Sequence, residues 1–279
     1  MGLIISTAMC IGLLVIFNVC GKKNGRLPAK PIIHLVLLGL AAASVITVFA
    51  FVATDWDVWL LSGVFGLSSS NFFYLFIDNF ILTALVEEGL KYLVLRLYLR
   101  KKDLIKNTYQ GLVAASAVAA GFVAAENVIY ILGESGLVLR LTFGIFGHFV
   151  YAVFMGADIV KARLTEDASK KRMLYLRALF LPVLLHGVYD FVLSVLELEF
   201  DAFLYIFVLL NAIAVFVFFY IIGTIKKIRA AVRELKAISG QAVPVTEKAE
   251  TEKVVTENMD TEIKEAEIVE TTEVETKEG

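Results

Sequence analysis

The sequence predicts an all-α fold, a polytopic membrane helix bundle of about seven transmembrane helices with the N-terminus outside and the C-terminus inside. Three observations lead to this prediction: an apolar composition, repeated apolar runs of spanning length, and basic residues confined to alternate loops. Hydrophobic residues make up 58% of the 279 residues, and the mean hydropathy is +0.77. Such values are typical of multi-pass membrane proteins and exclude an ordinary soluble domain.

A transmembrane helix needs about 20 mainly apolar residues. Runs of roughly this length lie near 3–20, 32–53, 74–99, 109–132, 138–160, 174–197 and 201–224. The stretch 56–70 is apolar but short and rich in Gly and Ser, so we expect an interfacial or re-entrant segment there. The fourth run is dominated by Gly, Ala and Ser between Gly111 and Ala125. Small residues let helices approach closely in lipid, which predicts a central place for this helix.

Loop charge sets the predicted orientation. Basic residues gather after the first, third, fifth and seventh runs, at Lys22, Lys23, Arg26, Lys30, Arg100, Lys101, Lys102, Lys106, Lys161, Arg163, Lys170, Lys171, Arg172, Lys226, Lys227, Arg229 and Arg233. The alternate loops are acidic, and the positive-inside rule places the basic loops in the cytoplasm. Residues 1–236 therefore form the membrane domain. The remainder, 237–279, has eleven Glu and one Asp against four Lys, which predicts an acidic, disordered cytoplasmic tail.

The third run contains two adjacent acids, Glu87 and Glu88, in its middle. A carboxylate at the bilayer centre costs roughly 2.5–3.5 kcal/mol on insertion scales, so such residues are usually functional. Lys91 lies three and four residues further on, and we expect it to form an ion pair with one of them. Asp158, near the cytoplasmic end of the fifth run, is expected to face lipid headgroups or Lys161.

Three other runs also contain polar residues, namely Glu126, His148, His186 and Asp190. With a rise of about 1.5 Å per residue, these residues and the two glutamates can share one layer near the bilayer midplane. His186 and Asp190 are four residues apart and share a helix face. The sequence therefore predicts one polar site built from four helices.

Carboxylate and imidazole groups allow a narrow chemistry, because no His-Glu-x-x-His motif or aspartyl-protease motif is present. A glutamate beside a histidine can activate water for attack on an amide, and a further group can stabilise the oxyanion. Alternatively, His148, His186 and a glutamate such as Glu126 can bind zinc. A proton-coupled transporter with a Glu/His relay is the alternative from another class, although no internal repeat is evident.

The ordered motifs Glu87-Glu88-x-x-Lys91, Phe122-x-x-x-Glu126-Asn127, His148 and His186-Gly-Val-Tyr-Asp190 resemble the PrsW family of polytopic membrane proteases. That family is similar to the CAAX prenyl endopeptidases, and the resemblance covers about 70–195. It implies an intramembrane endopeptidase of the cell membrane that cuts a membrane-anchored protein. An anti-sigma factor cut at site 1 is such a substrate, and no nucleic-acid partner is expected.

The resemblance also implies roles for the six residues. Glu87 and Glu88 activate water, Glu126 assists or coordinates, His148 and His186 orient water or the oxyanion, and Asp190 supports His186. The CAAX relatives favour a metal-free glutamate mechanism without a cofactor. Those relatives have His where this chain has Glu126, which leaves zinc binding open.

Overall fold

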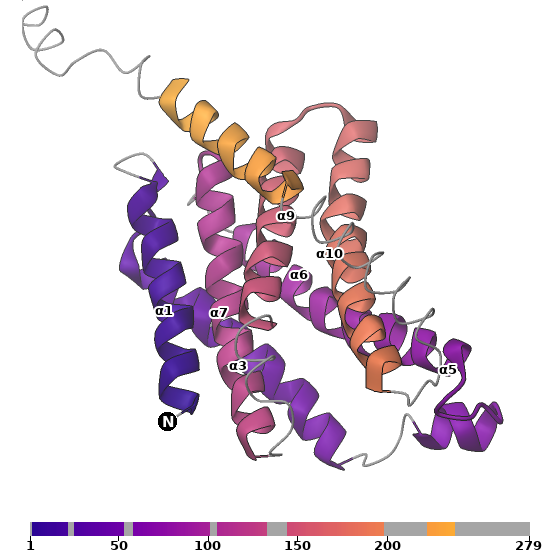
Figure 1. The fold of residues 1–279 in the computed structure, drawn as a ribbon. Helices are drawn as coiled ribbons and strands as arrows, with labels where there is room; N and C mark the ends of the chain where they lie inside the picture. The colour runs from indigo at the N-terminus through magenta and orange to yellow at the C-terminus, as the bar shows by residue number, and fades with distance from the viewer. Residues whose placement is uncertain are drawn as a thin grey trace, which may run out of the picture. The chain divides into compact units, whose positions relative to one another are not determined.

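The computed structural model describes residues 2–21, 25–52, 58–100, 105–132, 144–197 and 222–237. All regular structure in these residues is helical (Figure 1). In chain order the elements are α1 (Gly2–Cys20), α3 (Ala29–Val52), η1 (Trp59–Val64), α5 (Phe72–Phe76), η2 (Ile77–Ala84), α6 (Leu85–Arg100), α7 (Thr108–Leu132), α9 (Ile145–Leu164) and α10 (Ala168–Glu197). A further helix covers 222–237.

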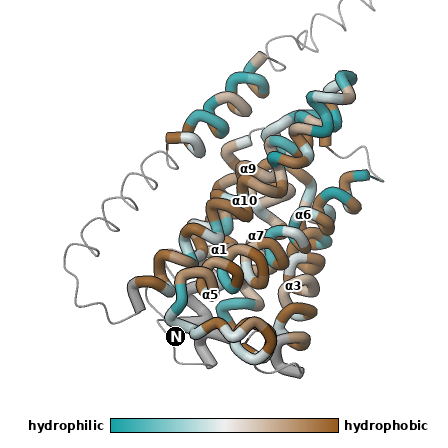
Figure 2. Tube along the Cα trace, turned by 90° about the vertical axis from the view of Figure 1, so that its right-hand side faces the viewer, coloured by the Kyte–Doolittle hydropathy of each residue, from teal (hydrophilic) through white to brown (hydrophobic). Residues whose placement is uncertain are grey.

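Four of the helices in the described residues are long and apolar enough to cross a membrane, at Ala29–Phe49, Thr108–Val128, Ile145–Leu164 and Ala168–Val195. They correspond to the second, fourth, fifth and sixth predicted spans, and their hydrophobic lengths are visible in Figure 2. A shorter apolar helix, Thr7–Cys20, matches the first. The predicted seventh span, 201–224, lies outside the described residues except for 222–224.

Helix boundaries differ from the predictions in three places. The sixth helix, α10, begins at Ala168 rather than at 174. The fifth, α9, continues to Leu164, and the part of its predicted span before 144 lies outside the described residues. The helix at 222–237 begins inside the predicted seventh span, 201–224, and continues through the basic segment that follows it.

The third predicted span, 74–99, is a helix that changes type along its length. The segments α5, η2 and α6 follow one another without a break, and the residues at both junctions have right-handed helical backbone angles. The middle segment, η2, is a π-helix. Its turns hold more residues than those of an α-helix, so it changes the face that the next residues present, and such segments are frequent at functional sites. Glu87 and Glu88 follow directly, in the first turn of α6.

The stretch predicted as interfacial or re-entrant contains a short helix rather than a span. η1 covers Trp59–Val64 and ends in a turn in which Gly66 has a φ of +65°. Leu61 is buried, whereas Trp59 and Phe65 are 67% and 62% exposed. Residues 56 and 57 lie outside the described part.

The helix α7 is central, as its small residues predicted. It packs against α3, α9, α1 and α6, and most of its side chains from Tyr109 to Val123 are buried. A Cβ added to Gly121 would overlap the carbonyl of Val36 on α3, and one added to Gly39 would overlap the carbonyl of Val118 on α7. The two backbones touch at these glycines, as small residues allow in membrane bundles.

We expect Gly121→Leu to lower the free energy of unfolding by about 3 kcal/mol, because the new side chain forces α3 and α7 apart. The matched control is Gly12→Leu in α1, where an added Cβ meets nothing within 4 Å. Denaturant unfolding of both variants in detergent measures the difference. Equal midpoints for the two variants would contradict the close packing of α3 on α7.

The chain divides into two units, Met1–Leu235 and Lys236–Gly279. The predicted acidic tail lies outside the described residues beyond 237, so its disorder stays a prediction.

Candidate active site

Lys91 connects the two glutamates of α6. Its Nζ lies 2.8 Å from Glu88 Oε1 and 3.4 Å from Glu87 Oε2. Helix geometry causes this pairing, because residues three and four apart share one face, and it confirms the ion pair expected from the sequence. Glu88 and Lys91 are 1% and 3% exposed, so each charge depends on the other rather than on solvent.

Two histidines meet this ion pair from other helices. His148, in the first turns of α9, has its Nδ1 2.8 Å from Lys91 Nζ and 3.7 Å from Glu88 Oε1. His186, in the second half of α10, has its Nδ1 3.0 Å from the same Glu88 oxygen. The centroids of the two imidazole rings are 5.1 Å apart. Both Nδ1 atoms therefore face one carboxylate oxygen.

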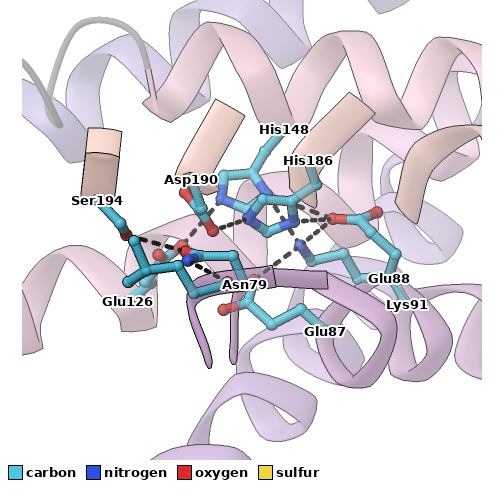
Figure 3. A network of polar contacts seen from close by, with 10 residues as sticks. Asn79, Glu87, Glu88, Lys91, Glu126, His148, His186, Asp190 and Ser194 are labelled. Atoms are coloured by element: carbon cyan, nitrogen blue, oxygen red, sulfur yellow. Dashed lines mark hydrogen bonds and ion pairs between the residues drawn. The ribbon is translucent and has the colours of Figure 1, made fainter. Parts of the chain in front are cut away.

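Each histidine has a second carboxylate at its Nε2 nitrogen. His148 Nε2 lies 3.0 Å from Glu126 Oε2 on α7, and His186 Nε2 lies 3.1 Å from Asp190 Oδ2 on the next turn of α10. Figure 3 shows the result: with Lys91 as a bridge, the structure brings all six candidate residues into one polar network.

The hydrogen bonds constrain the histidine tautomers. The Lys91 ammonium can only donate, so His148 Nδ1 accepts and His148 Nε2–H donates to Glu126. His186 lies between the carboxylates of Glu88 and Asp190, and a neutral ring can donate to only one of them. When Asp190 accepts that bond, the Nδ1 lone pairs of both histidines point to the same region beside Glu88.

Aromatic side chains hold this network in place. The centroid of the Phe122 ring lies 3.8 Å from Lys91 Nζ, a contact that stabilises a desolvated ammonium. Tyr151 stacks on His186, with ring centroids 5.1 Å apart and planes 17° from parallel. Tyr151 was not among the residues predicted for the site. Its position one turn after His148, on the same face of α9, is a signal that could have found it.

A small cavity lies on the Nε2 side of His148 and His186. Its volume is about 20 Å³, and it is lined by Val123, Glu126, Asn127, Gly144, His148, Tyr151, His186, Tyr189 and Asp190. A polar cavity of this size holds roughly one water molecule. Asn127 is 4% exposed, and its Nδ2 has no hydrogen-bond partner among the described residues. The cavity thus combines carboxylates and imidazoles with a buried amide that has an unused donor.

The Nδ1 side of the two histidines, which faces Glu88, has the donors of a metal site. Glu87, Glu88, His148 and His186 each offer one ligand atom, and these atoms lie within 4.8 Å of one another. Imidazole and carboxylate ligands suit zinc, and outer carboxylates like those on the two histidines usually support metal-bound imidazoles. The residues therefore fit a zinc ion. Because Lys91 Nζ lies among the same donors, a bound metal and the ammonium are alternatives at this position.

The expectation for Asp158 was wrong. This residue is fully buried at 0% exposure and accepts two hydrogen bonds from Arg177, at 2.7 and 2.9 Å, and one from Lys227 at 2.8 Å. It faces neither headgroups nor Lys161. A carboxylate inside an apolar bundle requires such partners, which join α9 to α10 and to the helix at 222–237.

Comparison with known proteins gives one family. Residues 30–222 match the family described as "PrsW family intramembrane metalloprotease". No solved structure matches the chain.

Among similar proteins, the "Protease PrsW" of Oceanobacillus iheyensis is 35% identical over 46% of this chain and 59% of its own length. The protein of that name from Clostridioides difficile is 29% identical over 62% and 73% of the two chains. That of Bacillus subtilis is 32% identical over 44% and 56%. The chain thus spans less than two thirds of the length of two of these three relatives.

The family match covers more than half of the chain and includes all the residues of the polar network, from Glu87 to Asp190. Together with the four helices of spanning length, it identifies the chain as a multi-pass membrane protein. The chain belongs to the PrsW family of intramembrane metalloproteases.

Proposed function

We propose that the chain is a membrane-embedded endopeptidase that hydrolyses peptide bonds of a membrane-anchored protein. The observation that supports this most directly is the meeting of Glu88, His148 and His186 from three helices, with Nδ1–Oε1 distances of 3.0 and 3.7 Å. Polar groups of this kind are costly inside a bundle of membrane helices, and they are usually kept for function. The name of the family favours proteolysis over the proton-coupled transporter that the sequence left open.

For zinc, we propose that His148, His186 and one or both of Glu87 and Glu88 are the ligands, with Glu126 and Asp190 as outer supports. When bound, the ion would polarise a carbonyl oxygen and lower the pKa of a bound water. The set suggested by the sequence, with Glu126 as a ligand beside the two histidines, stays a prediction. The outer position of Glu126, at His148 Nε2, makes Glu88 the better ligand.

The residues around the cavity can carry out each proton transfer that hydrolysis of a peptide bond requires. A water in the cavity gives a proton to Glu126, and its oxygen attacks the carbonyl carbon of the scissile peptide. The Asn127 amide, which has a free donor among the described residues, donates to the oxyanion that forms. Glu126 then returns the proton to the amide nitrogen as the C–N bond breaks. Asp190 orients His186 and Glu126 orients His148, and Lys91 keeps Glu88 charged and in place when no metal is bound.

We further propose that the substrate is cut on the extracytoplasmic side, with an anti-sigma factor as the candidate that the family resemblance suggests. This orientation follows from the predicted seven spans, N-out and C-in, with 1–236 as the protease domain and 237–279 as a cytoplasmic tail.

Quantitative sequencing of protein N-termini in host membranes tests the proposed function. We expect cells with the wild-type chain to contain new termini of membrane-anchored proteins that are absent from cells with His186→Ala. The matched control is His34→Ala, an exposed histidine on α3, which should leave those termini unchanged. Identical termini in all three strains would contradict the protease. If His186→Ala also abolished proton flux into proteoliposomes that contain the protein, the chain would be a proton-coupled transporter instead.

A further inference from the structure

A second cavity lies between the ends of three helices, away from the polar network. Its volume is about 210 Å³, and its lining is Arg96, Arg100, Ile159, Arg163, Lys171 and Tyr175. Two of these residues come from the C-terminal half of α6, two from the C-terminal end of α9 and two from the start of α10. We call this cavity the basic cleft. It is ten times larger than the water-sized cavity at the histidines.

Among the described residues, the lining of the basic cleft has no negative charge to compensate its cations. Four of its six lining residues are cationic and none is acidic. In the described part of the chain, none of the four forms an ion pair with a carboxylate. By contrast, the neighbouring Arg177 is fully paired with Asp158. Four like charges around one cavity repel each other, and an anion in the cavity would reduce that repulsion.

Two of the arginines are held ready for such an anion. The guanidinium of Arg96 lies 4.3 Å from the centroid of the Tyr175 ring and donates to Tyr92 OH at 2.9 Å, which fixes its plane. The Nη1 of Arg163 is buried and has no hydrogen-bond partner among the described residues. A buried donor without a partner costs free energy, and an oxyanion in the cleft would remove that cost.

We propose that the basic cleft binds a phosphate group, as found in phospholipid headgroups and in soluble phosphates. Arginine forks match phosphate oxygens in geometry and charge. The ends of α6, α9 and α10 that form the cleft belong to the basic, cytoplasmic loops of the predicted topology, and basic pockets between helices on that side bind anionic headgroups. A headgroup of the inner leaflet is therefore the expected source. The site is separate from the proposed protease centre and does not depend on it.

The test uses the full-length protein in nanodiscs of phosphatidylcholine with a minor fraction of phosphatidylglycerol, and native mass spectrometry counts the lipids that remain bound. We expect wild type to retain phosphatidylglycerol in preference to phosphatidylcholine. The double variant Arg96→Gln/Arg163→Gln should retain at least about tenfold less, since charged hydrogen bonds of this kind are lost. The control Lys170→Gln/Arg172→Gln removes two exposed charges from the start of α10 outside the cleft and should behave as wild type.

A second arm adds inorganic phosphate to protein in pure phosphatidylcholine. A rise in the unfolding temperature of wild type, absent in the cleft variant, would support a phosphate site filled from solution. No preference of wild type for phosphatidylglycerol and no effect of phosphate would overturn the proposal, even if the cleft variant failed to fold. An equal loss of lipid in the control variant would also overturn it, because general surface charge would then explain the binding.

Discussion

We expect Glu88→Gln to lower peptide-bond cleavage by at least about 10³-fold, the loss seen when a member of a catalytic unit is removed. Glu88 Oε1 lies within 3.0 Å of both Lys91 Nζ and His186 Nδ1. The amide that replaces it has no charge to hold the ammonium and is a weak metal ligand. The measurement is cleavage of a membrane-anchored substrate after reconstitution of the purified protein.

The same variant should still accumulate in the membrane, because Gln has almost the shape of Glu and Lys91 keeps Glu87 as a partner at 3.4 Å. The matched control is Glu166→Gln, an exposed glutamate between α9 and α10, which should cleave at the wild-type rate. Full activity of Glu88→Gln would remove Glu88 from the mechanism. Equal losses of cleavage in Glu88→Gln and Glu166→Gln would show that removal of any negative charge is enough to lower activity.

Removal of bound metal should have an effect of similar size. We expect 1,10-phenanthroline to lower cleavage by at least about 100-fold, and added Zn²⁺ to restore it, because the site loses the Lewis acid that His148, His186 and Glu88 would hold. The control compound is 1,7-phenanthroline, which has the same size and hydrophobicity but does not chelate. Activity that survives exhaustive chelation would support the metal-free glutamate mechanism that the CAAX resemblance favours.

The metal content of the protein provides a readout that does not depend on activity. We expect about one zinc ion per chain in the wild type, as for a single site with these donors, and almost none in His148→Ala/His186→Ala. The single variant His34→Ala should keep its zinc. Full zinc content in the double variant would place the metal elsewhere in the chain.

The sequence predicted the elements of the bundle better than their contacts. Apolar length alone predicted a span at 109–132, and α7 covers Thr108–Leu132. The many small residues of α7 predicted its central place, because close helix packing in lipid requires them. Contacts within one helix, such as Lys91 with Glu88 or His186 with Asp190, followed from the helical period.

Contacts between helices were beyond sequence reasoning, because packing sets how each helix is rotated about its own axis. The distance of 2.8 Å between Lys91 Nζ and His148 Nδ1 joins residues 57 positions apart. The π-helix η2, which precedes Glu87, further changes the rotation that an ideal α-helix would predict. Asp158 shows the same effect: Lys161 is nearest in sequence, whereas its partners Arg177 and Lys227 come from other helices.

The claim that Glu88, His148 and His186 act as one hydrolytic unit is tested most directly by comparing their single variants with the triple variant in the reconstituted cleavage assay. Residues that act as a unit lose their effect together, so their mutations are strongly non-additive. We expect Glu88→Gln, His148→Ala and His186→Ala each to reduce cleavage almost to the background rate, and the triple variant to be no slower than the slowest of them by more than a few-fold. Modest losses that multiply in the triple variant would show three independent residues and contradict the shared site.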